Sequence, residues 1–353
     1  MRNRNLSRTT SDRRAAFTKT NLWTVAAALL LVLAAAEVQG QPARPSSVGL
    51  TNYHGWDNAI AVNNGVVEAI VVPTIGRVMQ FRFAGDTNNA FWENPSFFGQ
   101  NPFPRFKDFG GDKAWPAPQN SWRPNWPPSD FDTMTNAASF SNGIVTMVRA
   151  TDTRFGIRST RIIELLPNQP VMKIRTIFER VAAAAQASLV DSNIAVWIDC
   201  QASVSMGSHC YIPVPSPSIF TNGYTLTGDA FFGPTLPPSY AQANGLISFG
   251  PDTAASHKVG FDSGTLVLVG ANLSLRMEAP RVPGVPYTSG GCSAEVYTAK
   301  FEAASPFFEL ELLSPAPPLG VGEKREFVST YSLFHRTEPT TDAEAQKVLS
   351  AKN

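Results

Sequence analysis

The sequence has little charge of either sign. Charged residues make up 16% of the 353 residues, against roughly 25% in an average soluble protein. Together with 28 prolines and 25 glycines, this argues against a coiled coil, a helical bundle and a highly charged disordered chain. The formal net charge is only +1, and because basic residues gather before residue 40, the rest of the chain is net negative. We therefore expect no nucleic-acid partner.

Several motifs of catalysis and cofactor binding are also missing. The four histidines are scattered, and no two have the spacing of a zinc site. The chain has no G-x-S-x-G elbow, no phosphate-binding loop and no dinucleotide fingerprint. These absences exclude the hydrolases, NTPases and dehydrogenases that depend on such motifs. We expect no cofactor and no bound metal.

Residues 1–40 have the pattern of an export signal. A basic stretch ends at Lys19, an apolar run extends from Leu22 to Ala36, and cleavage after Gly40 fits the residues that precede it. The apolar run is about 15 residues long, shorter than the roughly 20 that cross a bilayer, so we expect no stable membrane span after cleavage. Residues 13–17 resemble a twin-arginine signal, which leaves the export route open. We expect the mature protein to be periplasmic or secreted.

Export would place the three cysteines in an oxidising compartment. Cys200 and Cys210 have the separation of a hairpin, so we expect them to form a disulfide and Cys292 to remain free.

The remaining chain is dominated by segments with the pattern of β-strands. They are rich in β-branched and aromatic residues, and several alternate apolar with polar side chains. Turns such as Asn63-Asn64-Gly65 separate them. The predicted strands are 66–72, 78–83, 144–150, 157–166, 171–180, 194–201, 246–249, 266–269, 294–299, 307–313 and 325–333.

Many strands without alternating helices predict an all-β fold, a large antiparallel sandwich or barrel. We expect a short linker at 41–47, one domain at 48–337, and a C-terminal tail at 338–353 with a helical pattern.

A segment rich in proline and tryptophan, residues 109–122 with its extension to Pro128, is the first candidate site. Because proline lacks the donor that a central strand needs, we predict an ordered loop. Indole rings can stack on the C–H face of a pyranose, and polar groups can bind its hydroxyls. This makes Trp115 and Trp122 candidate stacking platforms, with Asp112, Lys113 and Gln119 as hydrogen-bonding groups. The alternative is that the tryptophans fill one end of the sandwich.

Two glutamates form the second candidate site. Strand periodicity places Glu309 and Glu311 on one face and the apolar residues of 307–313 on the other. Two neighbouring carboxylates can share acid and base work if their pKa values differ. The alternative is a solvated face of an edge strand.

Three motifs strengthen the carbohydrate hypothesis. They are Asn64-Gly65-Val66-Val67-Glu68 with Pro73, then Gly76-Arg77-Val78-Met79-Gln80-Phe81, then Gly110-Gly111-Asp112-Lys113 with Trp115-Pro116-Ala117-Pro118-Gln119. In this order they resemble an uncharacterised family of bacterial domains in the galactose mutarotase-like superfamily, and the G-G-D-K-x-W-P-x-P-Q pattern is the specific part. The resemblance covers about residues 50–336. It implies a β-supersandwich with an open carbohydrate cleft on one sheet.

The C-terminal part is similar to aldose 1-epimerases. Leu310-Glu311-Leu312, followed by Leu319, Gly322-Glu323 and Thr330-Tyr331, is similar to their pattern L-E-x-Q, L-x-P-G-E and T-x-Y, and Leu313 stands where the pattern has glutamine. The match implies that Glu311 is the base that removes the anomeric hydroxyl proton. The epimerase strand with the general acid reads N-H-x-Y-F-N-L, but segment 194–201, its counterpart in order, has no histidine. Mutarotation also needs an acid, so this chain uses another donor or does not catalyse it.

The sequence thus predicts an exported protein that binds a mono- or oligosaccharide, with sugar epimerase or mutarotase-type activity. In this hypothesis Glu311 is the base and Lys113 the acid. The expected substrate-binding residues are Arg77, Asp112, Trp115, Gln119, Trp122 and Glu309. The alternative is a non-catalytic polysaccharide-binding or cell-envelope module.

Overall fold

The computed structural model describes residues 46–352, except 103, 105, 123–128, 186–192, 229–232, 303 and 305. The predicted export signal and the extension that contains Trp126 lie outside these residues. Within the described part, no helix is both long and apolar enough to cross a bilayer.

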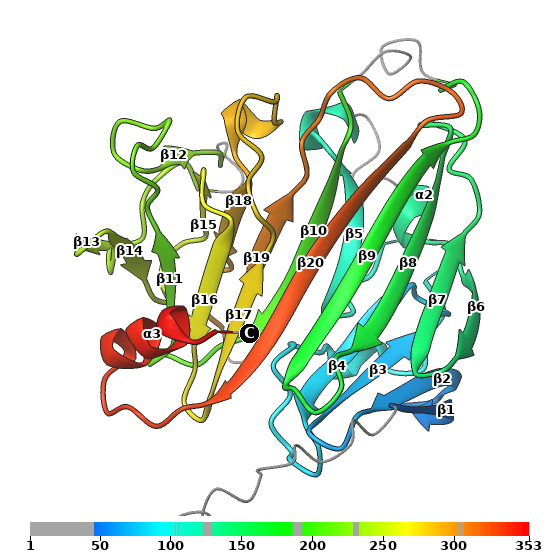
Figure 1. Ribbon diagram of the computed structural model, residues 1–353, viewed down its shortest axis with the longest axis horizontal. Helices are drawn as coiled ribbons and strands as arrows, with labels where there is room; N and C mark the ends of the chain where they lie inside the picture. Colours follow the sequence, from blue (N-terminus) through cyan, green and yellow to red (C-terminus); the bar gives the residue numbers. More distant parts are fainter. Residues whose placement is uncertain are drawn as a thin grey trace, which may run out of the picture. The chain divides into compact units, whose positions relative to one another are not determined.

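The strands form two antiparallel sheets of ten strands each (Figure 1). The first sheet has the order β1 (Ser47–Tyr53), β2 (Trp56–Asn63), β3 (Val67–Val72), β4 (Arg77–Phe83), β5 (Gly111–Ala117), β10 (Ala195–Ser203), β19 (Phe307–Leu313), β18 (Ala294–Thr298), β15 (His257–Phe261) and β12 (Thr225–Leu226). The second has the order β13 (Ala241–Ala243), β14 (Leu246–Phe249), β11 (His209–Pro213), β16 (Thr265–Val269), β17 (Leu273–Glu278), β20 (Lys324–His335), β9 (Val171–Arg180), β8 (Ile157–Leu165), β7 (Ile144–Arg149) and β6 (Asn136–Ser141).

The main core lies between the two sheets, where the apolar faces of the alternating strands meet. In β9, for example, Met172, Ile174 and Phe178 are buried in this core, whereas Arg175 is exposed. Each buried side chain of this size contributes roughly 1.5–3 kcal/mol to folding. The prediction of an all-β antiparallel sandwich is confirmed.

The prediction of a loop for the segment rich in proline and tryptophan is wrong, because β5 is an inner strand between β4 and β10. β5 pairs with β10 along its whole length, including Pro116 opposite Val196. On its other side, β5 pairs with β4 only through Asp112 and Val78. Among the described residues, no strand pairs with Pro116 on the side of β4. The backbone N–H that proline lacks is therefore not needed there.

The predicted disulfide is also wrong. Cys200 lies on β10 of the first sheet and Cys210 on β11 of the second, because the chain passes from one sheet to the other between them. All three cysteines are free and buried. Burial raises the pKa of each thiol, so none of them is an activated nucleophile.

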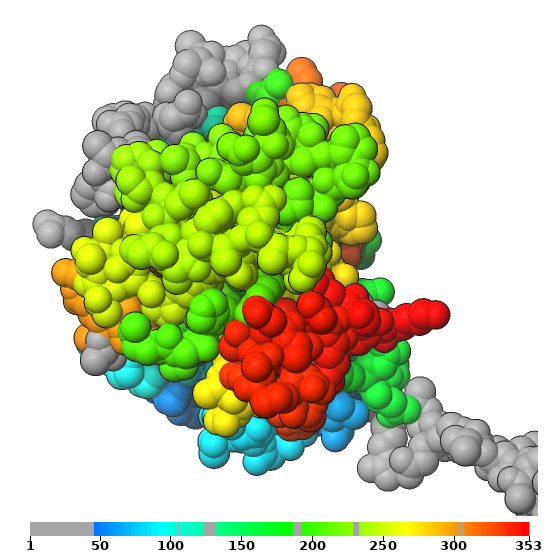
Figure 2. All heavy atoms as spheres, turned by 90° about the vertical axis from the view of Figure 1, so that its left-hand side faces the viewer, coloured from blue at the N-terminus to red at the C-terminus, as the bar shows by residue number. Residues whose placement is uncertain are grey.

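Helix α3 (Thr341–Ser350) packs on the second sheet, on the side away from the main core. Its Ala345 and Val348 contact a small apolar cluster that includes Val267 and Val269 of β16. The Thr340 side chain caps the helix by accepting a hydrogen bond from the backbone of Ala343. Figure 2 shows α3 in red, covering this part of the surface.

Candidate functional site

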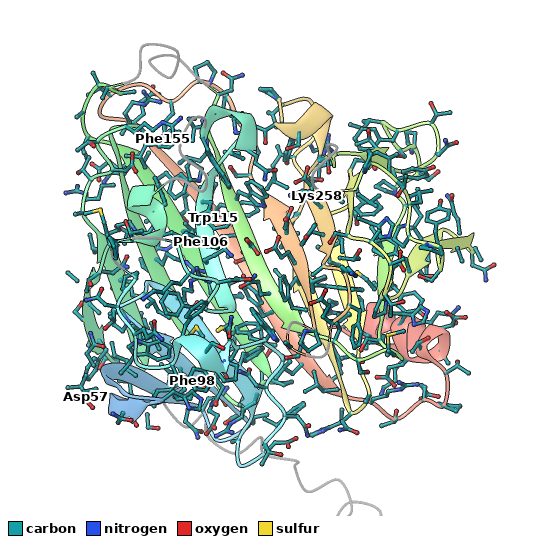
Figure 3. All side chains as sticks on the ribbon, turned by 180° about the vertical axis from the view of Figure 1, so that it is seen from behind. Asp57, Phe98, Phe106, Trp115, Phe155 and Lys258 are labelled. Carbon is teal, nitrogen blue, oxygen red and sulfur yellow. The ribbon has the colours of Figure 1, made fainter. Side chains whose placement is uncertain are left out.

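The candidate site is the face of the first sheet that points away from the second, here called the outer face. The side chain of Asp112 on β5 points toward the second sheet, because it contacts Arg161 of β8 and Tyr331 of β20 there. Because side chains alternate along a strand, the neighbours of Asp112 on β5 point the opposite way. Figure 3 looks onto the outer face, with the labels of Trp115 and Lys258 on opposite sides of the central green strand, β10.

One row of charged side chains crosses this face on four adjacent strands. Lys113 pairs in register with Asp199, Asp199 with Glu311, and Glu311 with Glu295. The Lys113 Nζ lies 2.9 Å from Asp199 Oδ2. The Lys258 Nζ lies 3.0 Å from Glu311 Oε1 and 3.4 Å from Glu295 Oε2. All five side chains are at most 5% exposed, so this is a buried ion network and not a solvated edge.

A second row lies one step along the strands. Gln201 of β10 pairs in register with Glu309 of β19, which pairs with Tyr297 of β18. The Gln201 Nε2 donates to Glu309 Oε1 at 3.1 Å and to Asp108 Oδ1 at 2.8 Å. Glu309 is half-buried, unlike Glu311, which is fully buried.

The aromatic rings of this region pack mainly on one another. Trp122 is fully buried, its Nε1 donates to the Pro116 carbonyl at 2.6 Å, and its ring stacks on Trp197 at a centroid distance of 5.3 Å. Trp115 is 7% exposed and meets Trp122 edge-on at 5.0 Å. The two lysine ammonium groups lie over indoles, Lys113 at 4.1 Å from the Trp115 centroid and Lys258 at 4.4 Å from that of Trp197.

Burial controls the titration of this face. Burial, and after it the nearby Asp199, raise the pKa of Glu309 to about 8, while Lys113 opposes the shift. Burial also raises the pKa of Glu311 well above its usual value, although Lys258 acts in the opposite direction. For Lys113, burial disfavours the charged form, but Asp199, Glu309 and Asp132 together outweigh it and the pKa is raised. Glu309 therefore tends to hold a proton at neutral pH, while both lysines stay charged.

Several buried polar atoms on the outer face have no hydrogen-bond partner among the described residues. The acceptors are Asp199 Oδ1, Gln201 Oε1, Glu295 Oε1 and Glu311 Oε2, and the donors are the Nε1 atoms of Trp115 and Trp197. Most buried polar atoms in folded proteins are paired. Unpaired ones gathered on one face indicate a site for a polar ligand.

Two glycines place β5 in this arrangement. A Cβ on Gly110 would lie 2.1 Å from the Trp92 carbonyl oxygen, and one on Gly111 would lie 2.6 Å from that of Val78. Both residues have positive φ, a conformation in which side chains are strained. The two glycines of the G-G-D-K motif thus let the chain pass close to two neighbouring segments just before Lys113.

The structure brings four of the predicted site residues together on the outer face, namely Lys113, Trp115, Glu309 and Glu311. The other four have different surroundings. Asp112 points into the main core and leaves the candidate site. Trp122 has no free ring face, which fits the alternative that it fills space.

Arg77 and Gln119 lie at the margin of the site. The Arg77 guanidinium donates to the Gly110 carbonyl at 2.8 Å and pairs with Asp132 at 3.1 Å. Gln119 lies partly exposed in a short 3-10 turn, η2 (Gln119–Trp122), beyond the end of β5.

Sequence reasoning missed several residues of the site: Trp197, Asp199, Gln201, Lys258 and Glu295. A signal was present on β10, where Trp197, Asp199 and Gln201 alternate with apolar residues in the same way as the two glutamates. Lys258 could not be found, because only the sheet order brings β15 close to β19. Among the described residues, no group of three or more His, Cys, Asp or Glu side chains could hold a metal ion.

Comparison with solved structures identifies the fold. A galactose mutarotase-like protein from Lactobacillus casei ATCC 334 covers 78% of this chain and 100% of its own at 11% identity, with a TM-score of 0.52. A candidate aldose 1-epimerase from Escherichia coli K12 covers 82% and 100% at 12% identity, with a TM-score of 0.52. A galactose mutarotase-like protein from Clostridium acetobutylicum covers 83% and 99% at 10% identity, with a TM-score of 0.51.

Comparison of the sequence with protein-family models and with curated proteins finds no match. At identities this low, the structural likeness concerns the fold and not the activity. The fold that the motifs implied is confirmed. The chain therefore has the galactose mutarotase-like β-supersandwich fold.

Proposed function

We propose that the outer face binds a carbohydrate and transfers protons at its anomeric centre, as in a mutarotase. The observation that carries the proposal is the buried ion network around Asp199 and Glu311, with unpartnered donors and acceptors on the same face. Sugar hydroxyls both donate and accept hydrogen bonds, so one ligand can satisfy both kinds of atom. The names of the structural neighbours agree with a sugar-related role.

Proton transfer would use the glutamate pair on β19. The Lys258 ammonium contacts Glu311 at 3.0 Å, so we assign the negative charge to Glu311 and the base role with it. Among the described residues, Glu309 has no lysine or arginine in contact, and its pKa of about 8 keeps it protonated at neutral pH. Glu309 would therefore donate a proton to the ring oxygen and replace the histidine that β10 lacks.

Lys113 is a weaker choice for this acid than the sequence suggested. Its ammonium is held by Asp199 at 2.9 Å, and its pKa is raised. We assign it the role of fixing Asp199 beneath the ligand. Because Trp115 is nearly buried, its contribution would come from the unpartnered Nε1 rather than from an exposed ring face.

Calorimetric titration with D-glucose and D-galactose tests the binding. We expect saturable binding of at least one of them, and about tenfold weaker binding by Asp199→Asn, because hydrogen bonds to a charged group contribute about 1.5–3 kcal/mol. The matched control is Glu326→Gln on β20, at an exposed position of the other sheet. Equal affinities of wild type and Asp199→Asn would exclude this face as the binding site.

The non-catalytic module remains the second reading, since Glu311 is fully buried. Sugar binding without faster exchange of anomers would favour it. We also propose, from residues 1–40, that the protein is exported. Fractionation of cells that produce the full chain tests this, and recovery only from the cytoplasm would contradict it.

A further inference from the structure

We infer that the outer face selects sugars that carry a protonated amine over neutral and acidic sugars. This inference rests on the proposed function and names its ligand class more narrowly. It follows from an imbalance between acidic and basic groups on the face, and between acceptors and donors.

Among the residues that the structure describes, the charged groups on the outer face are unequal in number. Three fully buried carboxyl groups, Asp199, Glu295 and Glu311, contact two ammonium groups, those of Lys113 and Lys258. Two further carboxyl groups, Glu309 and Asp108, lie beside them and share the Gln201 amide as a donor. Arg77 does not correct the excess, because it is paired with Asp132. A buried carboxylate without a full countercharge is costly, so a cationic ligand group would be stabilised here.

The unpartnered atoms point to the same ligand. The four acceptors come from β10, β18 and β19, which are adjacent strands. The two unpartnered indole donors lie on β5 and β10, one step along the strands from the Lys113–Asp199 pair. An ammonium has three N–H donors and no acceptor, which fits the group of four acceptors. Hydroxyls of the same sugar could accept from the indoles.

Acidic sugars should bind poorly for the same reason. A carboxylate placed near Glu295 and Glu311 would meet like charges at low dielectric. Lys113 and Lys258 could not compensate without leaving their present carboxylate partners.

The test is a calorimetric titration of the full-length protein with D-glucosamine, N-acetyl-D-glucosamine, D-glucose and D-glucuronate. It is done at about pH 6, where an amine of this kind is protonated. We expect glucosamine to bind about tenfold more tightly than glucose or N-acetylglucosamine, and glucuronate to bind most weakly. Glu295→Gln should bring the ratio of glucosamine to glucose affinity close to one, whereas Glu326→Gln on the other sheet should keep it.

If Glu295→Gln fails to fold, the affinities of the wild-type protein for the four sugars still decide the question. Glucose bound as tightly as glucosamine, or glucuronate bound more tightly than glucose, would overturn the inference and leave the proposed function intact. Binding of none of the four sugars would overturn both.

Discussion

Asp199 and Glu311 lie directly opposite each other on the antiparallel strands β10 and β19, and each is held by its own lysine. The two lysines come from β5 and β15, which flank this part of the sheet on opposite sides. Two like charges placed opposite each other destabilise a sheet. The lysines therefore make the juxtaposition possible.

Removal of Lys258 should destabilise the fold strongly. In Lys258→Met, the buried carboxylates of Glu295 and Glu311 lose the cation that contacts both of them. Breaking a buried pair costs about 3–5 kcal/mol in the free energy of unfolding. Urea unfolding at pH 7 measures this. Lys324→Met is the control, because the Lys324 side chain is 62% exposed in its ion pair with Glu179, and a change below about 1 kcal/mol is expected there.

Glu309 should make stability fall as the pH rises. Its pKa is about 8 in the folded protein against 4.5 for an ordinary glutamate, so the folded state binds the proton more tightly. The stabilisation is complete below about pH 4.5 and is lost progressively up to about pH 8. The unfolding free energy of wild type, minus that of Glu309→Gln, should therefore decrease over this window.

Glu179 should affect stability with the opposite pH dependence. The hydrogen bond from Arg158 lowers the pKa of Glu179, so the contribution of Glu179 to stability is present above about pH 4.5 and is lost only at lower pH.

A flat difference curve for Glu309→Gln between pH 5 and pH 8 would show that Glu309 is ionised in the folded protein. The acid role proposed above would then be untenable.

Trp122→Ala should reduce stability rather than only weaken ligand binding. The ring is fully buried against Trp115 and Trp197, and truncation of a buried tryptophan costs about 3–5 kcal/mol. Thermal and urea unfolding measure the loss. Stability within about 1 kcal/mol of wild type would mean that the ring is exposed in solution and available as a stacking platform after all.

Gly110→Ala should be more harmful than Gly65→Ala, although both residues have positive φ. Backbone strain from the unfavourable φ costs about 1–3 kcal/mol at either position. Only at Gly110 does the new Cβ also collide with a backbone oxygen, that of Trp92, whereas nothing lies within 4 Å of it at Gly65. Equal losses in unfolding free energy would mean that the close approach of these segments is not required.

Much of the fold could be predicted from the sequence because alternation is a local signal. The strands that became β8, β9 and β19 were found within a residue or two, and alternation correctly placed Glu309 and Glu311 on one face. Strand β5 was not predicted, because a strand can contain Pro116 only where β4 no longer pairs with it. That point is set by the whole sheet and not by the sequence of the segment.

The composition of the site was harder to predict. Asp112 and Lys113 are neighbours in one motif, yet they point to opposite faces of the sheet, so only Lys113 joins the site. The motif could not reveal this while the segment was taken for a loop. Lys258 lies 53 positions from Glu311 in sequence, and their contact depends on the order of β15, β18 and β19, which no local pattern encodes.

The rate of anomer exchange tests the central claim most directly. Exchange NMR gives the interconversion rate of the α and β anomers of glucose or glucosamine at pH 7, with and without the protein. We predict faster interconversion with wild type, and a rate reduced about 10²- to 10⁴-fold by Glu311→Gln and by Glu309→Gln, as expected for loss of a general base or acid. A rate no higher than that of the free sugar, for every sugar that binds, would contradict proton transfer at this face, and so would a rate that survives both substitutions within about threefold.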